Sequence, residues 1–458
     1  MLKRSLTVLL GAVLATTVAV PASAAAPESD HYGHHGQADK PYMGWSSWSM
    51  QSSKYPGLND KGDYSWLSEA NVLKQTDAVA SKLKRYGYEY INIDAGWWAD
   101  WKWNFGYDQY GRPTPNAERF PHGMKWVADY IHHKGLKAGI YIPVGLAKGV
   151  VDDGGHPVQG APGCTTLNLV FPDKRTTNGW DSSYKIDFSN PCAQKYIDSI
   201  ARMFAGWGYD FLKIDGVGPG SWKSGPQYDN RDEIAAYQKA FNKTGRDVHV
   251  ELSWSLDINY ISDWQRISQG WRIETDVECY CDTLVTWENS VNDRWNDLPA
   301  WLPFSGPGGW HDLDSLDVGN GKMDGLTDDE RYAYMTFWAI TSSPLYTGDD
   351  VTQLDDLGVK LLTNREVLAL NQQGRPAKPV KAGGDQQVWW ARNKDGSYTV
   401  ALFNLGSAPA KVNVNWSDIG LNGYRLTRDV WADKFLGFKK NGYEATIPSH
   451  GTQLLKVW

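Results

Sequence analysis

The stretch Tyr209-Asp210-Phe211-Leu212-Lys213-Ile214-Asp215-Gly216 predicts an apolar strand that ends in a lysine, a carboxylate and a glycine. Because side chains alternate along a strand, Lys213 and Asp215 project from the same face. A carboxylate beside a cation stays ionised at neutral pH and is available as a nucleophile. The same pattern also fits an ordinary salt bridge at a strand end, and the stretch alone does not decide between the two.

Strand-like and helix-like runs alternate about eight times around this stretch, between residues 41 and 371. We expect strands at 43–48, 88–94, 138–143, 209–215, 248–254, 271–276, 310–314 and 343–346. Amphipathic stretches between them predict helices at 71–85, 124–133, 193–207, 232–244 and 327–338. This alternation favours a parallel (β/α)8 TIM barrel over a doubly wound sheet. Reactive side chains of such barrels lie at the carboxyl ends of the strands. This chain places there Asp94, Tyr141, Asp215, Trp254, Asp276 and Asp312.

The pattern changes near residue 372, after which strand-like runs follow one another without helices. They lie at 388–391, 399–404, 411–416, 425–429, 444–447 and 453–457, separated by Gly and Asn turns. We therefore expect a catalytic α/β barrel at 41–371 and an antiparallel β-sandwich at 372–458.

The amino-terminal residues carry the marks of export. A basic start, an apolar run and the small residues Ala22-Ser23-Ala24 predict a secretory signal peptide at 1–24, followed by a disordered leader at 25–40. We expect a secreted, extracellular protein with no membrane attachment after cleavage. The cysteines of an exported chain are disulfide candidates, although their connectivity cannot be read from the sequence. They are Cys164, Cys192, Cys279 and Cys281.

Composition narrows the class of partner. A formal net charge of −7 without a basic patch argues against nucleic acid. The chain has 24 tryptophans and 24 tyrosines, and most of them fit core packing. The cluster of Trp97, Trp98, Trp101 and Trp103 is harder to bury, and aromatic faces stack on sugar rings. An oligosaccharide or polysaccharide is the expected substrate, and the oligomeric state stays open.

A second acid, Asp276, lies about two strands beyond Asp215, so we expect the barrel to direct both carboxyl groups into one pocket. Two carboxyl groups flanking a bond, one ionised and one protonated, are what retaining glycoside hydrolysis needs. The ionised group attacks the anomeric carbon, and the other protonates the leaving oxygen and then activates water. A helix cap is the alternative interpretation of Asp276. This chemistry implies no metal and no cofactor.

From Tyr42 to about Gln372 the chain resembles glycoside hydrolase family 27, whose typical members are alpha-galactosidases. The resemblance rests on segments in family order at 43–48, 90–94, 120–124, 212–216, 308–314 and 343–349. It implies that Asp215 is the nucleophile, that Asp276 is the acid/base, and that Arg272, four residues before Asp276, binds substrate.

The resemblance implies further roles at matched positions. Trp48 would form the floor of the pocket, and Tyr141 would lie beside the nucleophile. Asp94 and Lys213 would hold sugar hydroxyls through charge-assisted hydrogen bonds. Asp312 would support the site without reacting.

The chain departs from the family where the sugar is recognised. Ala95 stands where the family has a second aspartate, which reads the axial 4-hydroxyl and the 6-hydroxyl of galactose. Losing a charged acceptor for a hydroxyl costs about 1.5–3 kcal/mol. Ser253 replaces a glutamate, and Glu251, on the same strand face, could supply a different contact.

Four functions stay open in consequence. The leading hypothesis is a retaining enzyme that cleaves terminal alpha-galactosides. The alternatives are an alpha-1,6-glucan hydrolase of the isomalto-dextranase type and a beta-L-arabinopyranosidase. A non-catalytic carbohydrate-binding protein is the least favoured, because both Asp215 and Asp276 are present.

Overall fold

The computed structural model describes residues 38–59 and 66–458. The expected signal peptide (1–24) and nearly all of the expected leader (25–40) lie outside the described residues. Ala38, near the end of that leader, is anchored to the folded chain. Its carbonyl oxygen accepts hydrogen bonds from Trp310 Nε1 at 2.8 Å and from the Gly308 amide at 2.9 Å.

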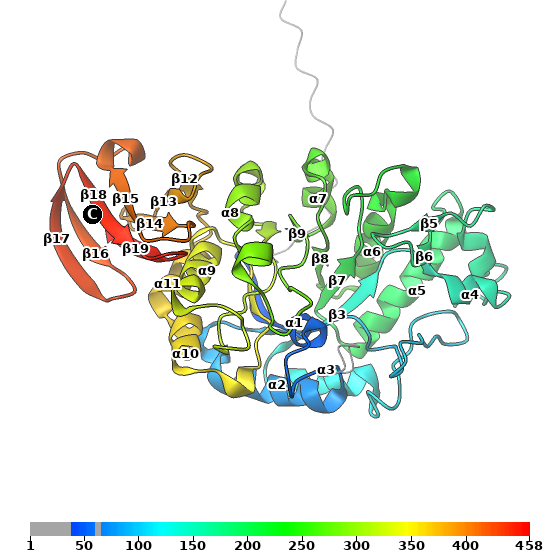
Figure 1. The fold of residues 1–458 in the computed structure, drawn as a ribbon. Coiled ribbons are helices and arrows are strands. Elements are labelled where there is room, and N and C mark those ends of the chain that lie inside the picture. Colours follow the sequence, from blue (N-terminus) through cyan, green and yellow to red (C-terminus); the bar gives the residue numbers. More distant parts are fainter. Residues whose placement is uncertain (1–37, 60–65) are drawn as a thin grey trace, which may run out of the picture. The chain divides into compact units, whose positions relative to one another are not determined.

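Eight parallel strands form the central sheet (Figure 1), in the spatial order β10-β9-β8-β7-β3-β2-β1-β11. Their bounds are β1 (Met43–Ser46), β2 (Tyr90–Ile93), β3 (Lys137–Pro143), β7 (Phe211–Asp215), β8 (His249–Leu252), β9 (Gly270–Arg272), β10 (Trp310–Asp312) and β11 (Leu345–Thr347). Each of the eight predicted strands is present, and the (β/α)8 barrel is confirmed. The observed strands are mostly shorter than predicted, because several loops begin at the polar residues that end each run.

Two hydrogen bonds, one to a side chain and one between backbone groups, link the residues after β10 to those around β11, the first and last strands of this order. The Leu313 amide donates to Ser343 Oγ at 3.1 Å, and the Leu316 amide donates to the Tyr346 carbonyl oxygen at 2.8 Å. Inside the barrel, the ring of Tyr42 contacts aromatic rings on β2, β7, β8 and β11, with centroid separations of 5.1–5.8 Å. One aromatic residue thereby fills the amino-terminal end of the barrel.

Helices follow most strands, and their ends obey ordinary capping rules. The larger ones are α2 (Glu69–Lys82), α3 (Gly123–His133), α5 (Pro191–Trp207), α6 (Arg231–Thr244), α7 (Ile261–Ile267), α9 (Asp328–Ile340), α10 (Asp356–Thr363) and α11 (Arg365–Gln372). Helix α5 begins where the Asn190 side chain accepts from the Cys192 amide, and it ends at Gly208 with φ of 97°. Helices α7, α10 and α11 escaped sequence analysis because seven or eight residues show too little periodicity.

Short elements surround the carboxyl ends of the strands. They are α1 (Trp48–Ser52), α4 (Lys148–Asp152), α8 (Arg294–Asp297), and the small sheet β4 (Leu146–Ala147), β6 (Ser183–Tyr184) and β5 (Thr176–Thr177). A disulfide between Cys164 and Cys192 links the insertion that contains this sheet to the start of α5. The second disulfide joins Cys279 to Cys281, so all four cysteine candidates are confirmed as disulfide-bonded.

The carboxyl-terminal strands form two antiparallel sheets, as expected. One has the order β12-β13-β14-β19-β16-β17, and the other pairs β15 with β18. The bounds are β12 (Lys378–Pro379), β13 (Gln386–Arg392), β14 (Tyr398–Asn404), β15 (Ala410–Asn415), β16 (Tyr424–Asp429), β17 (Lys434–Lys440), β18 (Gly442–Ile447) and β19 (Thr452–Val457). Sequence analysis missed β17, a strand with no fully buried residue and a glycine at its centre. The limits 41–371 and 372–458 stay predictions.

Helix α9 is the main contact between these sheets and the barrel. Trp431 Nε1 donates to Thr336 Oγ1 at 2.8 Å, and His450 Nδ1 lies 2.6 Å from a Glu330 carboxylate oxygen. Phe337 packs edge-on against Trp389, with ring centroids 4.8 Å apart. Across residues 38–59 and 66–458, no helix combines the length and the apolar character needed to cross a membrane.

The two disulfides offer a test of how the insertion is stabilised. Cys164–Cys192 closes a loop of 28 residues, whereas Cys279–Cys281 spans a separation of two. Replacing Cys164 and Cys192 together by serine should lower the free energy of unfolding by about 2–4 kcal/mol, because the longer loop gains more entropy when unfolded. The paired serine variant of Cys279 and Cys281 is the matched control and should be less destabilised in denaturant titrations. An equal fall in the free energy of unfolding of the two variants would contradict the larger stabilising effect expected for Cys164–Cys192.

Candidate active site

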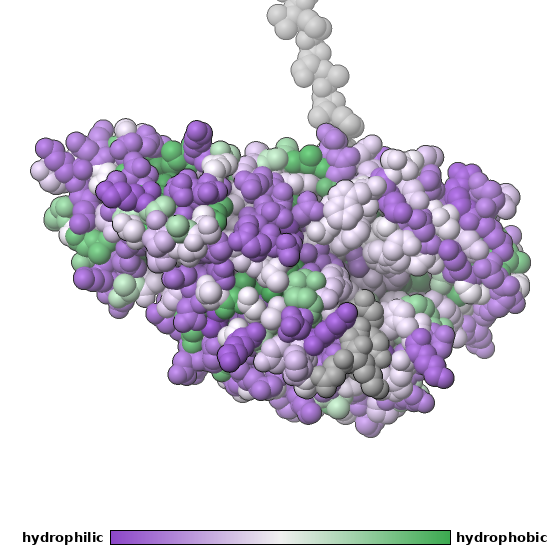
Figure 2. Space-filling view, in the orientation of Figure 1, coloured by the Kyte–Doolittle hydropathy of each residue, from purple (hydrophilic) through white to green (hydrophobic). Residues whose placement is uncertain are grey.

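A cavity of about 1,060 Å³ opens at the carboxyl ends of the barrel strands. Both predicted catalytic acids, Asp215 and Asp276, line it, as do Trp48, Tyr141 and Trp254. Figure 2 shows a hollowed area over the part of the molecule where β3 and β7 lie in Figure 1, bordered by pale residues of intermediate hydropathy. The sequence-based expectation that one pocket receives both carboxyl groups is therefore met by the structure.

Asp215 ends β7 and is held by two hydrogen bonds. Tyr141 Oη donates to Asp215 Oδ2 at 2.8 Å, and the Gly216 amide donates to Oδ1 at 2.8 Å. Burial, together with the Asp215 and Asp94 carboxylates, raises the pKa of Tyr141 well above its usual range, so its hydroxyl stays a donor. The carboxylate is thus fixed in orientation, and its side chain remains accessible from the cavity.

Asp276 lies in a different electrostatic setting, in the loop after β9. Burial, with the Asp314 carboxylate adding to it, raises its pKa to about 6, while Arg272 and Lys213 oppose the rise. Arg272 Nη1 lies 3.2 Å from Asp276 Oδ1, and Tyr280 Oη is hydrogen-bonded to Oδ2. A carboxyl group with this pKa can carry a proton near neutral pH, which is what a general acid needs.

Beneath the cavity, two cations are buried among carboxylates. Lys213 Nζ lies 2.9 Å from Asp94 Oδ2, and both side chains are at most 10% exposed. Arg272 reaches Asp312 at 3.2 Å and Asp314 at 2.6 Å. The pKa of Lys213 is raised although burial opposes it, because Asp94 and Asp215 favour its charged form.

Four predicted site residues therefore lie in this buried layer and do not line the cavity. They are Asp94, Lys213, Arg272 and Asp312. Their contacts fit a supporting role, as expected for Asp312. Direct contacts of Asp94 and Lys213 with sugar hydroxyls stay predictions.

The two departures from the family pattern have different outcomes. Ala95 lines the cavity, which continues past it along Trp98, Trp103 and Phe105. Glu251, in contrast, is 2% exposed and lies 2.9 Å from His249 inside the barrel, so it does not serve the sugar in place of a glutamate at position 253. The predicted tryptophan cluster is divided too. Trp98 and Trp103 line the cavity, whereas Trp97 is fully buried and its Nε1 donates to the Tyr141 carbonyl oxygen at 2.9 Å.

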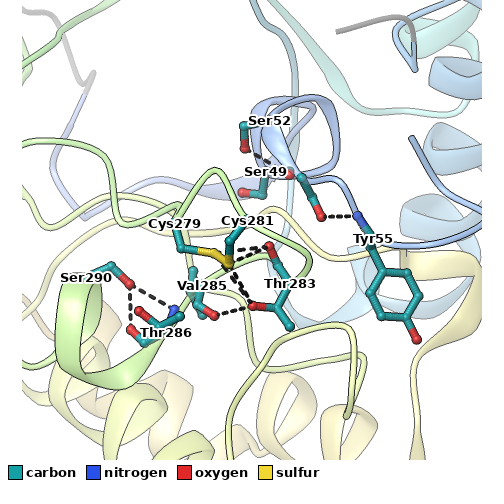
Figure 3. The surroundings of a disulfide bond; sticks show 10 residues. Ser49, Ser52, Tyr55, Cys279, Cys281, Thr283, Val285, Thr286 and Ser290 are labelled. Carbon is teal, nitrogen blue, oxygen red and sulfur yellow. Dashed lines mark hydrogen bonds between the residues drawn. A yellow bond between two sulfur atoms is a disulfide. The ribbon is translucent and has the colours of Figure 1, made fainter. Parts of the chain in front are cut away.

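The segment after β9 presents alternate side chains to the site. Asp276, Glu278 and Tyr280 line the cavity, while Cys279 and Cys281 point away and are joined by their disulfide. Figure 3 shows this disulfide beside Thr283, whose Oγ1 lies 3.3 Å from Cys281 Sγ and donates to the Val285 carbonyl oxygen at 2.9 Å.

Sequence analysis named Asp276 but missed Glu278 and Tyr280. The available signal was that Asp276, Glu278 and Tyr280 lie two residues apart, which is the spacing of side chains on one face of an extended segment. The segment is nevertheless a loop and not a strand. Burial, with Asp314 and Asp276 adding to it, raises the pKa of Glu278 well above its usual range. Its Oε1 accepts a hydrogen bond from Ser49 Oγ at 2.6 Å. Trp180 and Trp222, which also line the cavity, were likewise not predicted.

One group of carboxylates in the described part of the chain has the spacing of a metal site. Oxygen atoms of Asp276, Glu278 and Asp314 lie within 4.8 Å of one another. The Arg272 guanidinium already contacts Asp276 and Asp314, so a protein cation supplies the positive charge there.

Comparison with known proteins identifies the family. A model described as alpha galactosidase A matches residues 40–188 and 180–373, and one described as the alpha galactosidase C-terminal beta sandwich domain matches residues 383–457. The chain belongs to glycoside hydrolase family 27. It is an alpha-galactosidase-like glycosidase, and the expected resemblance is confirmed.

Relatives of this family cover nearly the whole chain. An alpha-galactosidase from Cyamopsis tetragonoloba is 30% identical over 448 residues, covering 93% of this chain and 90% of its own. A family 27 beta-L-arabinopyranosidase from Geobacillus stearothermophilus has a TM-score of 0.81 at 28% identity, covering 93% of this chain and 98% of its own. Alpha-galactosidase I from Mortierella vinacea has a TM-score of 0.71 at 29% identity, with the same coverage of both chains.

The buried pair of Lys213 and Asp94 can be tested independently of activity. Lys213→Met leaves the Asp94 carboxylate buried without its cation, and the free energy of unfolding should fall by about 3–5 kcal/mol. Adding Asp94→Asn to the same chain removes the uncompensated charge and should restore part of the stability. Denaturant titrations of both variants would contradict the ion pair if Lys213→Met were as stable as the parent.

Proposed function

We propose that the protein is a retaining exo-glycosidase with Asp215 as nucleophile and Asp276 as acid/base, acting on terminal alpha-galactosides. The observation that carries the proposal is the contrast between the two carboxyl groups in one cavity. Asp215 accepts hydrogen bonds from Tyr141 and Gly216, whereas the pKa of Asp276 is raised to about 6.

The reaction proceeds in two displacements. In the first, an Asp215 oxygen attacks the anomeric carbon while Asp276 gives its proton to the leaving glycosidic oxygen. In the second, the Asp276 carboxylate removes a proton from water, which attacks the anomeric carbon and releases Asp215. Two inversions restore the original anomeric configuration. Arg272 and Tyr280, which contact Asp276, hold the acid/base through both steps.

The family and the residue at position 95 narrow the identity of the sugar that is released. Curated relatives over nine-tenths of the chain are alpha-galactosidases, which supports galactose. A beta-L-arabinopyranoside is the second candidate, because it has the ring stereochemistry of an alpha-galactoside and lacks the hydroxymethyl group. Two observations favour it: the TM-score of 0.81 to a beta-L-arabinopyranosidase, and Ala95 in place of an acid that reads the 6-hydroxyl.

We also propose that the protein is exported. Support comes from the signal-peptide pattern of residues 1–24 and from the two disulfides, which form and persist in oxidising compartments. Edman sequencing of protein secreted by its host should begin after Ala24. Retention of residues 1–24 on a protein found only inside the cell would contradict export.

A hydrolysis panel tests the substrate. We expect the protein to release sugar from nitrophenyl alpha-galactoside or nitrophenyl beta-L-arabinopyranoside, and the ratio of their kcat/KM values identifies the sugar. Nitrophenyl alpha-glucoside and dextran are the contrasting substrates. Activity on dextran without activity on either galactose-configured substrate would overturn the proposal in favour of the alpha-1,6-glucan hydrolase.

The products formed with azide distinguish the nucleophile from the acid/base. Asp215→Gly should lower kcat by roughly 10⁴-fold or more, since the nucleophile is removed. Added azide should then give a glycosyl azide of inverted configuration. In Asp276→Gly, azide instead attacks the glycosyl-enzyme and should give the retained configuration. NMR of the products distinguishes the two outcomes, and the same azide anomer from both variants would reject the assignment.

The pH profile tests the proton on Asp276. For raffinose, or the matching arabinopyranosyl oligosaccharide, kcat/KM should fall about tenfold per pH unit above roughly pH 6, because a sugar leaving group needs the proton of Asp276 in the first step. A glycosyl fluoride needs little acid assistance and serves as the control, so its kcat/KM should lack this alkaline limb. The same limb with both substrates would assign it to another group.

A further inference from the structure

Three tryptophans outside the catalytic machinery meet at the mouth of the cavity. Trp222 is 75% exposed, the most exposed large hydrophobic residue in the described part of the chain, and Trp180 is 44% exposed. Trp254 stands between them, with ring centroids 6.2 Å from Trp180 and 5.4 Å from Trp222. All three line the same cavity as Asp215 and Asp276. We call these three residues the tryptophan platform.

The platform comes from three separate loops that are fastened to one another. Lys223 Nζ lies 2.7 Å from Asp181 Oδ2, which joins the residues that directly follow Trp222 and Trp180. Ser221 Oγ donates to the Trp254 carbonyl oxygen at 2.7 Å, and the Ser221 amide donates to the Ser255 carbonyl oxygen at 2.8 Å. The exposed rings are therefore held by their backbones and are pre-organised for binding.

Two glycines allow the rings to approach the nucleophile. A Cβ atom on Gly179 would lie 2.7 Å from the Trp254 ring, and one on Gly216 would lie 3.1 Å from the Trp180 ring. Gly216 directly follows Asp215. The platform thus adjoins the reacting carboxylate, and side chains at these two positions would push its rings away.

The position of the platform in the sheet indicates which part of a substrate it meets. Asp215 ends β7 and Asp276 follows β9, while Trp254 follows β8, the strand between them. Asp94 follows β2, on the other side of β7. Trp254 therefore lies on the Asp276 side of Asp215, where the proposed mechanism places the leaving group.

We propose that the tryptophan platform binds the sugar units beyond the scissile bond of an oligosaccharide or polysaccharide substrate. The proposal rests on the function given above. Exposed tryptophan faces forgo burial, and pyranose rings offer the flat C–H surfaces on which such faces stack. Continuity with the catalytic cavity makes the occupant the rest of the substrate, since these rings line the same cavity as Asp215 and Asp276.

The test compares substrates with and without sugar units in the leaving group. Trp222→Ala should lower kcat/KM for raffinose, or for the matching arabinopyranosyl oligosaccharide, by about tenfold. The same variant should keep kcat/KM for the glycosyl fluoride of the released sugar within about twofold of the parent value, because fluoride offers the platform no sugar. Trp222→Phe keeps an aromatic face and should recover part of the activity. Trp126→Ala removes another exposed tryptophan, on α3 and outside the cavity, and should change neither value.

Affinity electrophoresis gives a second measurement that needs no turnover. Gels containing galactomannan, arabinogalactan or dextran should retard the parent protein in at least one case, and Trp222→Ala should abolish that retardation. Equal effects on oligosaccharide and fluoride, or no effect on either, would overturn the platform while leaving the glycosidase intact. If the parent protein cleaved no substrate, the proposed function would be rejected, and gel retardation would then be the test of sugar binding by the platform. If, in addition, no gel retarded the parent protein, the platform proposal would be overturned as well.

Discussion

The site depends on two buried cations set among carboxylates under the floor of the cavity. Lys213 and Arg272 are held by Asp94, Asp312 and Asp314, and each also lowers the pKa of Asp276. Such charges are expensive to bury unless every partner is in place, so the barrel must bring β2, β7, β9 and β10 together before the layer is stable. Arg272 and Lys213 oppose the pKa rise that burial gives Asp276. The stability of the fold and the protonation of Asp276 thus depend on the same ion pairs.

Sequence reasoning was most successful where periodicity and order carried the information. All eight barrel strands and the antiparallel sheets were predicted from the spacing of apolar runs, and the two candidate acids, Asp215 and Asp276, line one cavity as expected. It was less successful where tertiary contacts decide. Glu251 has the correct strand face for the site but lies at a depth inside the barrel that no sequence pattern shows. Short helices such as α7 and the exposed strand β17 lack the hydrophobic repeat that prediction needs.

Loop residues account for most of what was missed in the site. Glu278 and Tyr280 reach the cavity from a non-repetitive segment, and Trp180 and Trp222 come from loops whose course is set by contacts such as Asp181–Lys223. Loops diversify function on a constant barrel, which agrees with the departures from the family at positions 95 and 253. The catalytic candidates are therefore read more directly from this sequence than the identity of the sugar, because Asp215 ends a strand and most of the other residues that line the cavity lie in loops.

The disulfide between Cys279 and Cys281 lies on the back of the segment that carries Asp276, Glu278 and Tyr280. A crosslink between residues so close in sequence constrains little of the unfolded chain, so its effect is local to the folded loop. Reduction of this disulfide would therefore loosen the loop that carries Asp276 and leave the barrel strands in place.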